Sequence, residues 1–309
     1  MIAPLYKAQV ELLLDIIPYV DKEKCFALKG GTAINLFIWE MPRLSVDIDL
    51  TYLPFDDRNL ALSKISESIV RIKDSITTSL PGVQVEASGI TPGQKDRLLC
   101  SRNGTKIKIE VNTTMRGSIN PPAQKQIVPA VKKEFGKFAA MQVVSDAEIF
   151  GGKICAALDR QHPRDLFDIQ QLFDAGGIAE EIKDGFIAAL LSHNRPIHEM
   201  LKPNFQDQRE VFANQFQGMA LRPFTYDDYE STRERLVQEI NSLFTENDKK
   251  LLLSFKAGNP DWSLSKITRL QDLPAVKWKL QNILKLQSQD SKKHEVMLTN
   301  LRMVLSTKD

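Results

Sequence analysis

Two aspartates, Asp47 and Asp49, stand one residue apart in SVDIDLTY, where polar and apolar residues alternate from Ser45 to Tyr52. Side chains two positions apart on a strand point to the same side, so both carboxylates share one face with Ser45. Adjacent carboxylates repel unless a cation joins them, and magnesium is typically bound by one or two carboxylates together with substrate phosphates. The spacing predicts a magnesium site; the alternative is a half-exposed strand with a solvated acidic face.

A third carboxylate, Glu110, belongs to the alternating segment KIKIEVN, in which Lys106, Lys108 and Glu110 share one face. If this segment forms a strand beside the first one, Glu110 joins the aspartate pair. Three carboxylates can hold two metal ions that flank an in-line phosphoryl displacement. Taken alone, the segment is simply an amphipathic strand.

Gly30-Gly31-Thr32 follows a short apolar segment and opens a predicted helix over residues 32–41, which ends before Pro42. Free backbone N–H groups at the start of a helix bind anions, and small residues let phosphates approach. The tripeptide is therefore a candidate nucleotide-binding turn. The alternative is that the glycines only satisfy the geometry of the turn.

Basic and acidic residues recur on two further predicted helices that His162-Pro163 separates. Lys153 and Arg160 lie two turns apart on one helix face. Arg164 and Asp168 lie four residues apart on the next helix, which also carries Asp165. The break lets the second helix fold back, so that Lys153 and Asp168 face the same cleft. The alternative is a surface ion pair between Arg164 and Asp168, worth only ~0.3–0.5 kcal/mol.

The order of predicted elements indicates a mixed α/β (α+β) sheet followed by helices. A helix is expected over 57–79, a hairpin turn at Asn103-Gly104, and helical periodicity from about 145 onward. We expect a first lobe over residues 1–140 and a helical lobe over 141–309.

Composition sets the cellular expectations. The 309 residues carry a net charge of +2, so a nucleic-acid partner would need a local basic surface. Three widely spaced cysteines form no metal or disulfide pattern. The first segment bears Lys7, Glu11 and Asp15 at helical spacing, which favours an amphipathic helix over a signal peptide. We expect a cytoplasmic protein without a membrane span.

Four segments together, GGTAINLF, RLSVDIDL, KIEVN and KICAALDRQHPRDLFDI, resemble the nucleotidyltransferase AbiEii/MenT toxin family, and the tail that begins LLLSFKAGNPDW resembles its C-terminal part. The resemblance implies a polymerase-β-like nucleotidyltransferase fold with a helical second lobe. It also implies a toxin of a type IV toxin–antitoxin or abortive-infection system, paired with an AbiEi-type antitoxin. Some members transfer nucleotides to the 3′ end of tRNA, and others are associated with GTP binding.

Carried over residue by residue, the resemblance makes Asp47 and Asp49 the metal-binding pair, and Lys153 and Asp168 the lysine and last aspartate of the second motif. Glu110 matches the strand of the third carboxylate less closely. Gly31 departs from the broader superfamily, which has serine there, so a hydroxyl contact to phosphate is lacking unless Thr32 supplies it.

The expected reaction is magnesium-dependent, with one or two ions. A nucleoside triphosphate binds through Gly30–Thr32 and Lys153, for which Gly151-Gly152 leaves room. An acceptor hydroxyl attacks the α-phosphorus, and either Asp168 or Glu110 accepts its proton.

The expected acceptor is RNA, most simply a tRNA 3′ end, with Arg160 and Arg164 on its phosphates. Two alternatives stay open at this stage: a kinase-like phosphotransferase that acts on protein, and a non-catalytic nucleotide-binding member.

Overall fold

The computed structural model describes residues 4–89 and 93–306. The chain forms two compact units: unit 1 comprises Met1–Ser145 and Phe216–Pro223, and unit 2 comprises Asp146–Gln215 and Phe224–Asp309. Whereas the sequence analysis divided the chain between 140 and 141, the units change at 145/146. Residues 216–223 also return to unit 1.

Main-chain hydrogen bonds hold residues 216–223 on unit 1. Arg43 forms an isolated antiparallel bridge with Ala220. The N–H of Leu44 donates to the carbonyl of Met219 at 2.9 Å. Main-chain bonds of this kind leave no periodic signal in the side chains, so the sequence pattern does not reveal them.

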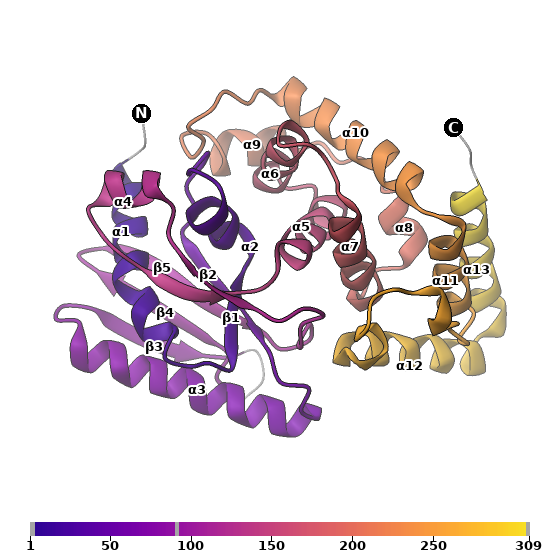
Figure 1. Ribbon diagram of the computed structural model, residues 1–309, viewed down its shortest axis with the longest axis horizontal. Helices are drawn as coiled ribbons and strands as arrows, with labels where there is room; N and C mark the ends of the chain where they lie inside the picture. The colour runs from indigo at the N-terminus through magenta and orange to yellow at the C-terminus, as the bar shows by residue number, and fades with distance from the viewer. Residues whose placement is uncertain (1–3, 90–92, 307–309) are drawn as a thin grey trace. The chain divides into compact units, whose positions relative to one another are not determined.

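Unit 1 is built on one sheet of seven strands in the order β3-β4-β5-β2-β1-β7-β6 (Figure 1). The strands are β1 Phe26–Lys29, β2 Asp47–Tyr52, β3 Gln84–Ser88, β4 Arg97–Arg102, β5 Thr105–Asn112, β6 Ala123–Gln126 and β7 Ala140–Val143. The β2–β5 and β1–β7 pairs are parallel, and the other neighbours are antiparallel. The predicted mixed sheet is confirmed.

The strand β2 lies near the middle of the sheet and shows the predicted alternation. Ile48 and Leu50 are fully buried, while Asp47 and Asp49 are half-buried. The β4–β5 hairpin turns at Asn103 and Gly104, both with positive φ (50° and 79°), as the sequence predicted.

Helices flank this sheet. They are α1 Pro4–Val20, α2 Gly30–Thr32, the π-helix η1 Ala33–Ile38, α3 Arg58–Ser79 and α4 Pro129–Phe135. Figure 1 shows α3 as the long purple helix along one side of the sheet. The N-cap of α3 is Asp57, whose side chain accepts from the N–H of Leu60 at 3.0 Å. The helix predicted over 32–41 is wider and shorter than expected, because residues 33–38 adopt π-helical bonding.

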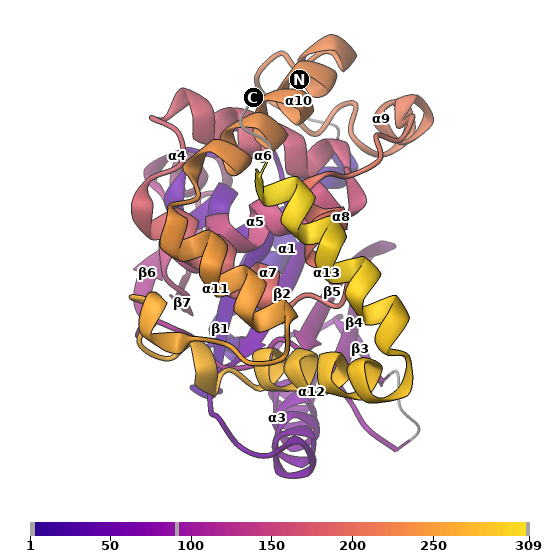
Figure 2. The ribbon, with the colours of Figure 1, turned by 90° about the vertical axis from the view of Figure 1, so that its right-hand side faces the viewer.

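In the described residues of unit 2, all regular secondary structure is helical (Figure 2). Its helices are α5 Asp146–Arg160, α6 Pro163–Asp174, α7 Glu180–Ser192, α8 Ile197–Leu201, α9 Arg209–Gln215, α10 Tyr226–Leu243, α11 Glu246–Lys256, α12 Pro274–Gln289 and α13 Ser291–Ser306, with short 3-10 turns at Trp262–Leu264 and Leu270–Asp272. In the described ranges, no helix is both long and apolar enough to cross a membrane.

Two glycines bring α5 and α7 into backbone contact. A Cβ atom on Gly151 would lie 2.2 Å from the carbonyl carbon of Gly185, and a Cβ on Gly185 would lie 1.9 Å from the carbonyl oxygen of Ala147. The space above Gly151 is therefore filled by α7. This corrects the expectation that Gly151 leaves room for a ligand, which holds only for Gly152, where a Cβ would meet nothing within 4 Å.

Candidate active-site residues

The Asp47 and Asp49 carboxylates project from the same face of β2. In strand register, Asp49 lies opposite Lys29 of β1 on one side and Glu110 of β5 on the other. Among residues 4–89 and 93–306, the Asp47 carboxylate has no hydrogen-bond or ion-pair partner, although its carbonyl oxygen accepts a bond from Thr32. An acidic side chain left open in this way is suited to binding a cation.

The glycine turn lies directly against these carboxylates. Gly30 has φ +71°, and a Cβ there would be 2.7 Å from Oδ2 of Asp49. Both facts require glycine, because any side chain would be strained and would collide with the carboxylate. The turn and the acidic face therefore form one continuous surface within unit 1.

Thr32 ties the turn to β2. Its hydroxyl is only 1% exposed, donates to the carbonyl oxygen of Asp47 at 2.5 Å and lies 3.0 Å from the hydroxyl of Ser45. The Thr32 hydroxyl is thus engaged inside the protein, and its visible role is to fix the spacing between turn and strand.

Arg43 and Ser45 occupy the place that a serine at position 31 would need. A Cβ on Gly31 would lie 2.7 Å from Nη2 of Arg43 and 2.9 Å from Oγ of Ser45. Arg43 is 2% exposed and donates to the carbonyl of Leu44 at 2.8 Å. Arg43 was not among the predicted site residues. The available signal was its position two residues before Ser45, which continues the alternation of β2.

Glu110 is adjacent to Asp49 in register, as predicted, but it is already bonded to cations. Its carboxylate oxygens lie 2.5 Å from Nη2 of Arg97 and 2.5 Å from Nζ of Lys108. Burial alone would raise the pKa of Glu110, but the hydrogen bonds from Lys108 and Arg97 outweigh it and lower the pKa. Within the described ranges, no group of three histidine, cysteine or acidic side chains is arranged to hold a metal ion.

In unit 2, Lys153 is the centre of a buried ionic cluster. Its ammonium lies 2.9 Å from Oδ1 of Asp165 and 3.0 Å from Oδ2 of Asp168, and all three side chains are at most 6% exposed. The two helices meet in this way because Pro163 begins α6 at its first turn and His162 caps it, with Nδ1 accepting from the N–H of Arg164 at 3.1 Å. Lys153 and Asp168 thus approach each other as predicted, but as a buried ion pair and not on the wall of an open cleft.

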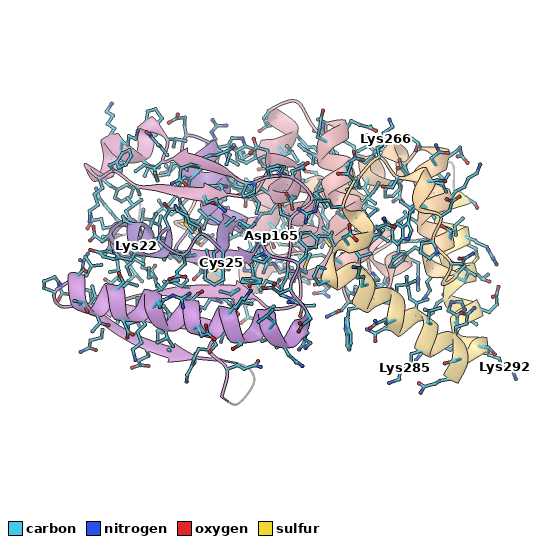
Figure 3. The ribbon with its side chains drawn as sticks, turned by 60° about the horizontal axis from the view of Figure 1, so that its bottom comes forward. Lys22, Cys25, Asp165, Lys266, Lys285 and Lys292 are labelled. Carbon is cyan, nitrogen blue, oxygen red and sulfur yellow. The ribbon has the colours of Figure 1, made fainter. Side chains whose placement is uncertain are left out.

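Asp165, labelled in Figure 3, completes this cluster. It accepts a 2.5 Å bond from Nε of Arg160, a side chain that is 59% exposed. Burial raises the pKa of Asp165, but Lys153 and Arg160 outweigh that effect and hold the pKa far below its usual range. Asp165 belonged to the predicted group of charged residues, but the sequence pattern assigned it no partner. Since Asp168 is fully buried, the reading of that residue as half of a surface ion pair is wrong.

Comparisons with known proteins agree with this architecture. Residues 11–282 match the family model described as nucleotidyl transferase AbiEii toxin, type IV toxin–antitoxin system. Among solved structures, the chain is similar to MenT4, a nucleotidyltransferase toxin from Mycobacterium tuberculosis H37Rv, with 13% identity and a TM-score of 0.61 over 90% of this chain and 93% of that one. No curated protein matches the sequence. Because the family model spans most of the sequence, the chain belongs to the AbiEii family of nucleotidyltransferase toxins of type IV toxin–antitoxin systems.

Proposed function

We propose that this toxin transfers nucleotides from a nucleoside triphosphate to an RNA acceptor, the 3′ end of a tRNA, in a magnesium-dependent reaction. The observation that carries the proposal is the contact between the Gly30 turn and the acidic face of β2. This surface combines a place for phosphates with a place for the cation that neutralises them.

Asp47 and Asp49 fit a magnesium ion. Both are half-buried on one strand face, the Asp47 carboxylate is open, and the lack of a side chain at Gly30 lets the turn lie directly against Asp49. When bound, magnesium supplies charge neutralisation at the phosphates. Glu110 serves as a ligand to a second ion only if it exchanges its bonds to Arg97 and Lys108.

The phosphates of the nucleotide are assigned to backbone amides and a cation. In unit 1 these are the Gly30–Thr32 backbone and Arg43, whose guanidinium borders Gly31. Within unit 2, Lys153 is a candidate phosphate contact by itself, since its ammonium has three N–H donors and the two carboxylates of its cluster face two of them.

Asp168 and Glu110 are assigned positioning roles. Asp168 orients Lys153 from a fully buried position, and Glu110 holds Arg97 and Lys108 in place beside β2. Glu110 is a weak proton acceptor because its pKa is lowered. Both carboxylates therefore act through neighbouring cations.

An RNA acceptor is supported by local basic side chains. Arg160 is largely exposed and Arg164 is half-buried at the start of α6, while Lys106 and Lys108 flank the acidic site along β5. Phosphate contacts supply most of the affinity for RNA, so transfer should weaken steeply with salt. A single-stranded 3′ end also presents its hydroxyls without unstacking.

The test uses the purified chain with each of the four triphosphates, labelled in turn on the α- or γ-phosphate, with magnesium and total RNA. We expect α-label on RNA, loss of labelling after periodate oxidation of the terminal diol, and no labelling when EDTA replaces magnesium. A γ-label that appears on protein and survives ribonuclease would instead identify the kinase-like phosphotransferase.

The role of an antitoxin is tested by expressing the toxin in cells with and without its partner. We expect the chain to arrest growth when produced alone and an AbiEi-type protein from the same locus to restore it. The Asp47→Asn, Asp49→Asn variant, produced to the same level, is the matched control and should be harmless. Arrest by that variant would separate toxicity from nucleotide transfer.

A further inference from the structure

A pocket of about 180 Å³ in unit 2, remote in sequence from every residue assigned above, has two lysines in its wall. Lys256 ends α11 and Lys279 lies in α12. Both are buried, at 5% and 9% exposure. No acidic side chain lines the pocket.

The fold supplies hydrogen-bond acceptors for part of the buried Lys279 ammonium. Its ammonium donates to the carbonyl of Leu190 at 2.9 Å and to that of Arg195 at 3.1 Å, so it caps the last turn of α7. Two of its three N–H groups are used in this way, and the third remains for another acceptor.

The Lys256 ammonium has no comparable oxygen acceptors in the described part of the fold. The contact of its ammonium is with the sulfur of Met297 at 3.7 Å, and a thioether is a weak acceptor. Burial lowers the pKa of Lys256, and no carboxylate offsets that effect. Burying a charge without a counter-ion is costly. An anion bound in the pocket would offset the desolvation penalty of the Lys256 ammonium, which no described side chain of the protein offsets.

The other residues that line the pocket indicate which kind of anion fits. Asn194 and Asn282 add amide donors where the pocket opens to solvent, because both are exposed. Ile283, Leu286 and Met297 supply an apolar wall. A carboxylate or phosphate group on a short apolar body matches both parts, whereas a bare inorganic ion leaves the apolar wall uncovered.

We propose that the pocket between α11, α12 and α13 is a binding site for a small anion with an apolar body, held by the ammonium groups of Lys256 and Lys279. The site belongs to unit 2 alone and does not depend on the proposed nucleotidyl transfer. It gives the toxin a second ligand site, separate in the chain from the residues of the transfer reaction.

The test measures binding to the full chain at pH 6.5 by calorimetry and by NMR. The probes are hexanoate and hexyl phosphate, with hexanol as the neutral analogue and inorganic phosphate as the anion without an apolar body. We expect saturable binding of at least one hexyl anion, at least tenfold tighter than hexanol and than inorganic phosphate. The head group that binds better identifies the class of ligand.

Variants locate the site. Lys256→Met should weaken binding at least tenfold, and Lys256→Arg should retain most of it because the charge remains. The matched control is Lys285→Met, on the same helix as Lys279 but projecting outward into solvent (Figure 3). The proposal is overturned if neither hexyl anion binds saturably, if hexanol binds equally well, or if Lys256→Met and Lys256→Arg both bind like the wild type.

Discussion

The two units treat their acidic side chains in opposite ways. On β2 of unit 1, Asp47 and Asp49 are half-buried, and the Asp47 carboxylate is open. In unit 2, Asp165 and Asp168 are buried and paired with Lys153 inside the protein. A motif carboxylate can therefore serve either by binding a cation from solution or by holding a neighbouring side chain in place. Under the proposed function, Asp47 and Asp49 are of the first kind, and Asp165 and Asp168 are of the second.

The largest expected effect concerns the two half-buried aspartates of β2. Asp47→Asn and Asp49→Asn should each lower turnover by on the order of a thousandfold, because several kcal/mol of transition-state stabilisation depend on the cation they hold. The melting temperature should change little, since neither side chain is in the core. Incorporation of α-label into RNA measures the loss.

The matched control is Glu86→Gln, an exposed carboxylate on the edge strand β3 of the same unit. It should leave turnover unchanged. Wild-type turnover in the Asp47→Asn, Asp49→Asn double variant would remove the difference between the two units and with it the proposed metal site.

The buried cluster should show the reverse pattern, a loss of stability first. Lys153→Met leaves two buried carboxylates without their shared ammonium, so the free energy of unfolding should fall by about 3–5 kcal/mol. Arg160→Gln should cost at most about 1 kcal/mol, because that side chain is largely exposed. Urea denaturation measures both.

A second substitution distinguishes the loss of the ionic cluster from a non-specific loss of stability caused by Lys153→Met. In Lys153→Met, Asp168→Leu one unpaired charge is removed, so part of the lost stability should return. An Lys153→Met variant no less stable than Arg160→Gln would show that the cluster contributes little to the fold and would return Lys153 to a purely ligand-binding role.

Much of unit 1 was predictable because its signals are local. The period of two in SVDIDLTY predicted β2 and the shared face of its aspartates, and Asn103-Gly104 predicted the hairpin. The place of Glu110 beside Asp49 followed from pairing two such strands. What the pattern did not reveal was the pair of cations on Glu110, because their distance depends on side-chain rotamers.

Features set by contacts between distant segments were not predictable. The role of Asp165 depends on how α5 and α6 pack, and the return of 216–223 to unit 1 depends on main-chain bonds. Gly151 and Gly152 look equivalent in the sequence, yet only Gly151 faces another helix. A periodicity argument cannot separate two such residues, since both fit a helix equally well.

The glycine pair tests this distinction directly. Gly151→Ala forces a Cβ into the backbone of α7 and should lower the free energy of unfolding by about 3 kcal/mol. Gly152→Ala meets open space in the same helix and should raise it by ~0.5–1 kcal/mol, because alanine favours the helix. Equal effects of the two substitutions in thermal or urea unfolding would show that α5 and α7 do not touch at Gly151.

A pH-dependent effect extends the comparison to a buried lysine without a carboxylate. Lys279 is buried in α12 among backbone carbonyls, and burial lowers its pKa to about 7, whereas Lys153 is faced by two carboxylates. In the unfolded chain Lys279 keeps the ordinary lysine pKa of 10.5. Between these two pKa values the unfolded chain binds one more proton than the folded chain. This residue therefore makes the folded state more stable as pH rises, by at most about 1.4 kcal/mol per pH unit. Below pH 7 both states hold the proton, and the free-energy penalty of burying the charged ammonium is constant.

The wild type should therefore gain stability relative to Lys279→Met from pH 7 to pH 9 in urea denaturation. The difference in stability between the wild type and Lys285→Met should not change with pH, because Lys285 is exposed on the same helix. Parallel pH profiles for the two variants would mean that the Lys279 ammonium keeps its proton in the fold and that its surroundings are as favourable to charge as those of Lys153.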